Sequence, residues 1–158
     1  MSLQPTIGRA KEGDIEAILA LWRSEGVPSS RTADAEALRG AIAHPTSAVL
    51  VARAEGTVVG SVIAAWDGWR GAMYRLVVAP EHRRQGLGTA LVERGEHHLT
   101  TIGARRIAVL IIDDSADATA FWRSAGYERQ PGLSRFVRRS DAAETASPIR
   151  PGAERSVT

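Results

Sequence analysis

Apolar residues along this chain follow two different spacings, and each spacing predicts one kind of element. Apolar runs, continuous or alternating, predict strands at residues 6–9, 48–53, 57–66, 73–79 and 107–112, with a closing strand at 135–138. Apolar residues three or four positions apart predict helices that begin near residues 14, 35, 86 and 114. We expect Asp14 to cap the first helix, and Asp114 with Asp117 to cap the last.

The segment 107–112 is apolar at every position, which is typical of a strand in a parallel sheet that is covered on both faces. With the strand at 73–79 and the helix between them, it predicts a βαβ unit with a right-handed crossover. Ligands of such α/β sheets bind outside the carboxyl ends of the strands. The pattern therefore predicts an α/β fold with a ligand site after residue 79.

A loop rich in arginine and glycine lies at that position and opens the predicted helix. The N–H groups of a first helical turn have no partners within the helix, and the helix dipole favours an anion there. Gly86 and Gly88 lack a Cβ, so a phosphate can approach the main chain. The loop is not a P-loop, because Lys11 is the only lysine, and Leu91 replaces the third glycine of a dinucleotide fingerprint.

The pattern Arg83-x-x-Gly86-x-Gly88 resembles the acetyl-CoA signature [RQ]-x-x-G-x-[GA] of the GCN5-related N-acetyltransferase (GNAT) superfamily. A second segment resembles the family's C-terminal motif N-x-x-A-x-x-[FL]-Y-x-x-x-G-[FY]; it reads Ser115-x-x-Ala118-x-x-Phe121-Trp122-x-x-x-Gly126-Tyr127.

The resemblance extends over about Thr6–Arg138 and implies the GNAT fold. That fold has a mixed central sheet of about six to seven strands, a parallel βαβ acetyl-CoA-binding core and flanking helices. We expect a single domain over residues 1–139 and a flexible tail over residues 140–158.

The resemblance implies an enzyme that transfers acetyl from acetyl-CoA directly to a primary amine of a small molecule, protein or peptide. Main-chain amides of the loop would hold the pyrophosphate, those near Val77 and Val78 would polarise the thioester, and both arginines would contact the ligand. The cofactor-binding residues implied are Val77, Val78, Arg83, Arg84, Gln85, Gly86, Leu87, Gly88, Thr89, Ala90, Ser115 and Trp122.

The usual acid and base of the family are missing. Trp122 stands at the position of the general-acid tyrosine, while Arg75 and Leu110 stand where relatives carry a glutamate. Tyr74, which strand alternation puts on the face opposite Arg75, is a candidate acid, with a packed aromatic as the alternative. Asp67 is a candidate amine contact, with a plain turn residue as the alternative. A chain of water molecules is a further route for protons.

We expect the acceptor side to be lined by the loop Arg23–Arg31 and by the turn segment 66–71. Arg70 in that turn and Arg75 in the strand after it, if exposed on this side, would favour an acceptor that carries a carboxylate or phosphate. The substrate-binding residues predicted are Trp66, Trp69, Arg70 and Arg75.

Composition narrows the remaining choices. The 158 residues suit one domain, and the absence of cysteine excludes disulfides and thiolate metal sites. The adjacent His97 and His98 make a poor metal pair, so no metal is expected. The net charge is only +2, and no apolar run spans a bilayer, so neither nucleic acid nor a membrane is expected as a partner. We expect a cytoplasmic monomer or homodimer. A non-catalytic acyl-CoA sensor is the main alternative.

Overall fold

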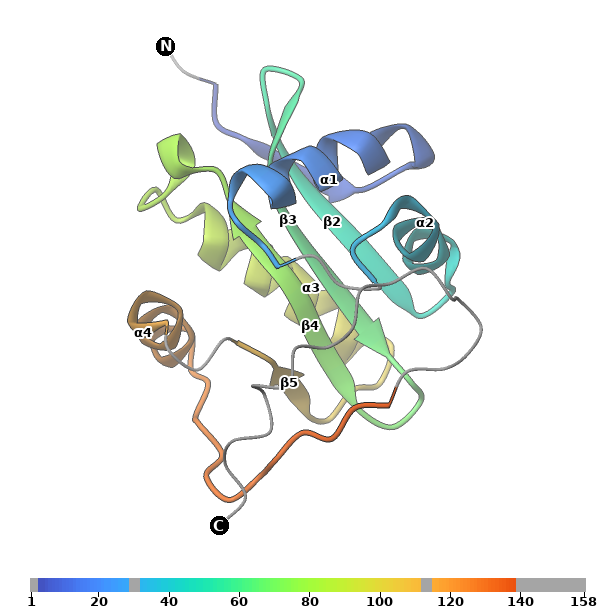
Figure 1. Ribbon diagram of the computed structural model, residues 1–158, viewed down its shortest axis with the longest axis vertical. Coiled ribbons are helices and arrows are strands. Elements are labelled where there is room, and N and C mark those ends of the chain that lie inside the picture. Colours follow the sequence, from blue (N-terminus) through green and yellow to red (C-terminus); the bar gives the residue numbers. More distant parts are fainter. Residues whose placement is uncertain (1–2, 29–31, 112–114, 139–158) are drawn as a thin grey trace. The chain divides into compact units, whose positions relative to one another are not determined.

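The computed structural model describes residues 3–28, 32–111 and 115–138. The chain divides into two units, Met1–Glu128 and Arg129–Thr158, and every helix and strand of the described residues belongs to the first. Five strands form one sheet in the order β1-β2-β3-β4-β5 (Figure 1). Their bounds are β1 Thr6–Arg9, β2 Ser47–Ala54, β3 Thr57–Trp66, β4 Gly71–Val78 and β5 Ile107–Val109.

The first four strands pair antiparallel, whereas β5 pairs parallel with β4. The turn at Glu55 and Gly56, both at positive φ, joins β2 to β3 as a hairpin. Between β4 and β5 the chain forms helix α3, Leu87–Thr101, which confirms the predicted βαβ unit. The observed architecture is therefore the mixed α/β sheet that the GNAT resemblance implies.

Helices cover both faces of the sheet. α1 (Ile15–Ser24) and α2 (Ala35–Ala43) lie on one face, and α3 lies on the other (Figure 1). The faces can be assigned from two neighbours in β3, because Ser61 is hydrogen-bonded to α1 whereas the Cα of Gly60 faces Leu91 of α3. A fourth helix, α4 (Ala116–Ser124), follows β5, and short 3-10 turns occupy Glu12–Asp14 (η1) and Pro80–His82 (η2).

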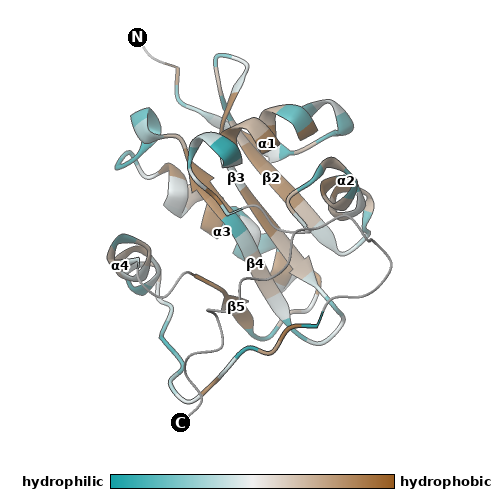
Figure 2. Cartoon of the chain, viewed as in Figure 1, coloured by the Kyte–Doolittle hydropathy of each residue, from teal (hydrophilic) through white to brown (hydrophobic). Residues whose placement is uncertain are grey.

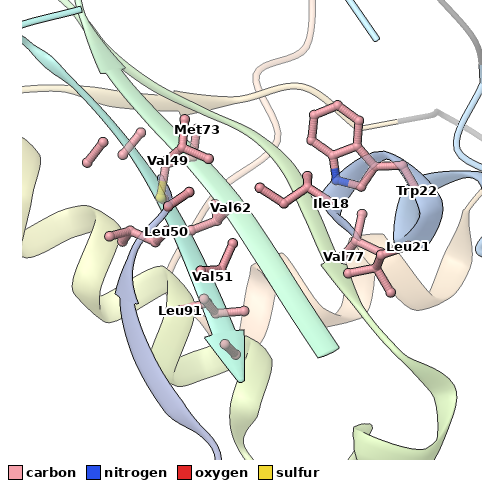
Figure 3. Close-up of a cluster of buried hydrophobic side chains, with 14 of the residues drawn as sticks. Ile18, Leu21, Trp22, Val49, Leu50, Val51, Val62, Met73, Val77 and Leu91 are labelled. Carbon is pink, nitrogen blue, oxygen red and sulfur yellow. The ribbon is translucent and has the colours of Figure 1, made fainter. Parts of the chain in front are cut away.

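Apolar side chains concentrate on the strands and on the inward faces of the helices (Figure 2). Figure 3 shows this core from within, with side chains of α1, α3 and the central strands around it. The largest fully buried residues are Trp22, Ile18, Leu38, Met73, Leu91, Leu99, Val51, Val62, Val92 and Ser61. Ser61 is the polar member of this set, which makes its hydrogen bonds important for the site below.

The sheet has fewer strands than the predicted six to seven. Residues 135–138 form no strand, and adjacent Phe136 and Val137 are 86% and 62% exposed. In a strand they would point to opposite faces, so this segment could not offer one apolar face to a core. β5 is also shorter than predicted and ends at Val109. Residue 112 and residues 139–158, which include the predicted tail 140–158, lie outside the described residues.

Two of the predicted helix caps are wrong. Asp14 precedes α1 but does not cap it, because its carboxylate instead accepts hydrogen bonds from the Lys11 N–H and from Arg53. The cap of α4 is Ser115, whose Oγ accepts from the N–H of Ala118 at 3.2 Å. Residue 114, which was expected at this position, lies outside the described residues.

Candidate active site

A bulge interrupts β4 in the middle of the sheet. Ser61 pairs with Val77 and Ile63 pairs with Tyr74, so β4 places two residues opposite one residue of β3. Arg75, the first of the two, has a φ of 56°, a left-handed conformation that is costly for a residue with a Cβ. The parallel pairing of β4 with β5 ends just before the bulge, at Met73 and Val109. Beyond this point β4 has an edge that β5 does not pair, which we call the open edge.

The main chain of Val78 points to the open edge. The N–H of Ala79 donates to the carbonyl of Val59 in β3 at 2.8 Å, and neighbouring residues of a strand direct these groups to alternate edges. The N–H and the carbonyl of Val78 therefore face away from β3, and those of Val77 face toward it. Of the two amides predicted to polarise a thioester, only that of Val78 has the required direction.

The donor loop, residues 83–90, follows η2 and begins α3. Gly86 is the N-cap, with a φ of 80° that favours glycine, and its carbonyl accepts the first helical hydrogen bond from Ala90 at 3.0 Å. The N–H groups of the first turn therefore have no helical partners. No side chain caps them and no acidic residue lies in the first turn. This helix end can accept an anion without displacing a group of the protein.

The two arginines of the donor loop differ in their contacts: the guanidinium of Arg83 bonds to other residues of the protein, whereas Arg84 is exposed. Arg83 donates from Nε to the carbonyl of Val78 at 2.9 Å, and its Nη2 forms an ion pair with the carboxylate of Glu25. Glu25 follows α1, and its side chain is only 12% exposed. Arg84 adopts a left-handed φ of 57° and is exposed. Gln85 bonds back to the carbonyl of Glu81. Phosphate contact by Arg83 and Gln85 remains a prediction, and Arg84 has the more accessible charge.

Gly88 has a packing role that its sequence context did not reveal. A Cβ at this position would lie 3.3 Å from the ring of Phe121 in α4, so glycine allows α3 and α4 to approach closely. Trp122, which is 8% exposed, packs edge-on against Phe121 and Tyr127, with ring centroids 5.3 and 5.0 Å apart. The second motif thus fixes α4 beside the donor loop.

Tyr127 is also part of this packing. Its hydroxyl donates to a carboxylate oxygen of Glu96 at 2.8 Å, and burial followed by this bond raises the pKa of Tyr127. A phenol with a raised pKa that is held by a carboxylate is a poor proton donor at neutral pH. This half-buried tyrosine is therefore a poor candidate for the missing general acid.

Tyr74 and Arg75 lie on the same face of the sheet, so the expectation of opposite faces is wrong. Tyr74 pairs with Ile63, which shares a face with Ser61 and hence with α1, and it is 42% exposed. The Arg75 guanidinium lies over the ring of Trp22 in α1 at 5.2 Å. Simple strand alternation fails here because the bulge inserts one residue. Burial lowers the pKa of Arg75, which still remains charged at neutral pH.

The turn between β3 and β4 holds the remaining candidates. Asp67 Oδ1 accepts from the N–H groups of Trp69 and Arg70 at 2.8 and 2.7 Å, the geometry of a turn-forming aspartate. The bond from Arg70, then that from Trp69, holds the pKa of Asp67 below its usual value. Trp69 is 74% exposed and carries the Arg70 guanidinium 4.3 Å above its ring.

Trp66 lies on the face of the sheet opposite Tyr74 and Arg75. A Cβ at Gly103, just after α3, would lie 3.6 Å from the Trp66 ring, which places the ring on the α3 face. Tyr74 and Arg75 lie on the α1 face, so Trp66 does not belong with them. Residues 29–31 of the predicted acceptor loop lie outside the described residues, while Pro28 accepts a hydrogen bond from Arg75 through its carbonyl.

Sequence reasoning missed three residues that support the site: Trp22, Glu25 and Ser61. Glu25 and Arg83 are 58 residues apart, and no sequence pattern links them. Ser61 did leave a signal, because it is a polar residue within the apolar strand 57–66. Its burial required a partner, and Trp22 provides one at 2.9 Å.

Two further findings bear on the classes of function considered. Within residues 3–28, 32–111 and 115–138, no three His, Cys, Asp or Glu side chains come together as a metal site. His98 accepts from Arg9 and contacts the Thr46 carbonyl rather than joining His97. The helices of this described part are all too short or too polar to cross a bilayer.

Comparisons with known proteins identify the family of this chain. The family described as Acetyltransferase (GNAT) family matches residues 15–127. An acetyltransferase of Yersinia pestis is 28% identical over 120 residues, which cover 76% of this chain and 85% of that protein.

Two solved structures illustrate the fold. The aminoglycoside N-acetyltransferase AAC(6')-Iy in complex with CoA is 18% identical, with a TM-score of 0.71 over 89% of this chain and 97% of its own. Glucosamine-6-phosphate N-acetyltransferase from Arabidopsis thaliana is 14% identical, with a TM-score of 0.67 over 86% and 100%. The acceptors named for these two neighbours are small amines. Because the family match spans most of the chain, the protein belongs to the acetyltransferase (GNAT) family and is an acetyl-CoA-dependent acetyltransferase.

Proposed function

We propose that the donor loop holds the pyrophosphate of acetyl-CoA on the first-turn amides of α3 and that the acyl end lies along the open edge of β4. The observation that supports this proposal most is the helix end itself. Leu87, Gly88 and Thr89 offer N–H groups without helical partners, and no acidic side chain competes with an anion there. Arg84 adds an exposed positive charge beside them.

The open edge suits the rest of the donor. The pairing of β4 with β5 stops at Met73, so a pantetheine arm can bind beside β4 without breaking strand hydrogen bonds. Apolar Leu110 and Ile111 follow β5 and are 56% and 37% exposed, and they offer contacts for an aliphatic chain. Ser115 and Trp122 would contribute to this side of the site by holding α4 in place. Ser115 caps the helix and Trp122 packs against Phe121, so neither would need to contact the donor through a polar group.

Acetyl-CoA supplies an activated thioester whose C–S bond breaks as the C–N bond of the amide forms. The N–H of Val78 would donate to the thioester oxygen, where negative charge develops. Tyr74 would protonate the departing thiolate, because this partly exposed residue lies on β4 just before the bulge and carries a phenol proton. The amine proton would leave through water, since Asp67 uses Oδ1 to hold its turn and has a lowered pKa.

We propose a small-molecule amine as the acceptor, bound on the α1 face beside Tyr74, with a peptide as the less favoured choice. Arg75 and the Trp69–Arg70 pair give this region positive charge. An acceptor that carries a carboxylate or phosphate would be attracted, whereas a polycation would be repelled. Because the donor is acetyl-CoA, we also propose a cytoplasmic location. We propose that the protein acts as a monomer or homodimer, and that neither nucleic acid nor a membrane is a partner.

Measurement of free CoA thiol over a panel of amines tests the proposal. The panel contains amino acids, amino sugar phosphates, aminoglycosides, polyamines and peptides at equal concentration. We expect turnover with amines that carry an acidic group and weaker turnover with the polycations. Best activity with spermidine would contradict the acceptor assignment. Binding of acetyl-CoA without thiol release from any acceptor would favour a sensor, an alternative that the replacement of the usual acid by Trp122 supports.

A further inference from the structure

A buried hydrogen-bond chain links α1 to the bulge of β4. The indole N–H of Trp22 donates to Ser61 Oγ at 2.9 Å, and Ser61 Oγ lies 3.1 Å from the carbonyl oxygen of Arg75. An indole N–H can only donate, so the single hydroxyl proton of Ser61 is left to donate to Arg75. Trp22 is 2% exposed and Ser61 is fully buried, so water does not compete for these bonds.

The series of hydrogen bonds ends at Arg75, the residue of β4 that has a strained main-chain conformation. Arg75 has a φ of 56°, and its carbonyl is held by a side chain of the neighbouring strand. Its guanidinium also lies over Trp22, so the same indole contacts Arg75 directly and through Ser61. A left-handed conformation at a non-glycine residue persists only where surrounding contacts hold it. At Arg75 these contacts include the hydrogen bond from Ser61, the ring of Trp22 and the carbonyl of Pro28, which accepts from the guanidinium.

The bulge in turn sets the direction of the groups at the open edge. Beyond Arg75 the register of β4 against β3 is shifted by one residue, which directs the N–H of Val78 away from β3. We propose that Ser61 and Trp22 are positioning residues for acetyl transfer, which lock the bulge so that the Val78 amide is aimed at the thioester oxygen. This inference rests on the proposed function, and it assigns a catalytic consequence to two buried residues that touch no substrate.

Two substitutions and one control test this inference. Ser61→Ala removes the hydroxyl with little change in volume, and Trp22→Phe removes only the indole donor while keeping an aromatic ring. The control is Ser47→Ala, which alters another buried serine, in β2, that is outside the hydrogen-bond chain. All variants are first compared with the wild type by circular dichroism and melting temperature. The kinetic comparison then uses the folded fraction of each.

We expect Ser61→Ala to lower kcat by roughly 10- to 100-fold, since small displacements of a catalytic group have effects of this size. The Kd of CoA, which depends on the donor loop, should change by less than about threefold. Trp22→Phe should lower kcat less, because Ser61 can still donate to Arg75. Ser47→Ala should match the wild type. A wild-type kcat in folded Ser61→Ala, or a parallel loss of kcat and CoA affinity, would overturn the inference.

A structural readout separates this inference from the proposed function. If the wild-type protein transfers acetyl to no acceptor, the catalytic proposal fails and the crystal structure of Ser61→Ala decides the role of Ser61. We expect Arg75 to leave the left-handed region and the β3–β4 register to relax in that variant. An unchanged bulge with Arg75 at positive φ would show that Ser61 does not hold it.

Discussion

Two substitutions at Gly86 separate the cost of adding a side chain from the effect of adding a negative charge. Gly86→Ala adds only a Cβ, whereas Gly86→Glu adds a carboxylate as well. The N-cap of α3 has a φ of 80°, and a Cβ built there meets no atom within 4 Å. Either substitution therefore costs about 1–2 kcal/mol of folding free energy through the left-handed main chain, without a steric clash. Both variants should fold, with similar melting temperatures. The difference between them measures the effect of a negative charge beside the first turn.

The size of that effect follows from Coulomb's law. At a separation of about 6 Å and an effective dielectric constant of about 40, each phosphate charge repels a carboxylate by about 1.4 kcal/mol. Two charges of a pyrophosphate give about 2.8 kcal/mol, or roughly a 100-fold increase in Kd. Gly86→Glu should therefore bind CoA about 100-fold more weakly than Gly86→Ala at low salt. The ratio should shrink at 1 M salt, where the Debye length is about 3 Å.

Isothermal titration calorimetry with CoA, at low and high salt, gives both affinities. Pantetheine, which has no pyrophosphate, is the matched control ligand and should not distinguish the two variants. If folded Gly86→Glu binds CoA within about threefold of Gly86→Ala, the pyrophosphate does not lie at this helix end. The same result with a large effect on pantetheine would place the acyl arm there instead.

Three other predictions test separate parts of the structure. Tyr74→Phe should lower kcat by about 100-fold with little change in the KM for acetyl-CoA. Asp67→Asn keeps the side-chain oxygen that accepts the hydrogen bonds of the turn, so it should retain kcat within about threefold. Equal losses of kcat in both variants would contradict the assignment of Tyr74 as the acid. Gly95→Ala should destabilise the fold by about 1–2 kcal/mol in urea denaturation despite the better helix propensity of alanine, because its Cβ would lie 2.8 Å from the buried sulfur of Met73; higher stability would refute this packing.

The third prediction of this group concerns pH. Burial raises the pKa of Asp14, but hydrogen bonds from the Lys11 N–H and from Arg53 outweigh it, so the pKa lies below the ordinary 3.8. A lowered pKa in the folded state adds stability above pH 3.8 that is lost as the pH falls through the folded value. Asp14→Asn should cost about 1 kcal/mol at pH 7 and progressively less below pH 3.8. A gap in melting temperature that is independent of pH would contradict this assignment.

Local patterns in the sequence predicted most of the fold. Apolar residues at helical spacing located α1 to α4, and the two glycines located the start of α3. These features depend on neighbouring residues, which a sequence displays directly. The strand at 135–138 was wrong because two adjacent apolar residues do not make an apolar face.

The candidate site was less predictable because it depends on contacts between distant residues. Alternation along β4 put Tyr74 and Arg75 on opposite faces, and only the register against β3 reveals the bulge that reverses this. Arg83 was expected to bind the ligand, yet in the structure its side chain bonds to Glu25 and to the Val78 carbonyl. Glu25 lies 58 residues away along the chain, and no local sequence pattern identifies either Glu25 or the Val78 carbonyl as a partner of Arg83.

Titration of the isotopically labelled protein with CoA, followed by the amide signals in NMR spectra, tests the central claim most directly. The claim is that unpartnered amides at the start of α3 bind the pyrophosphate. We predict that the largest shifts fall on residues 84–90, and that acetyl-CoA adds a shift at the amide of Val78 that CoA does not produce. Binding with the largest shifts elsewhere, or no binding at millimolar CoA, would contradict the account.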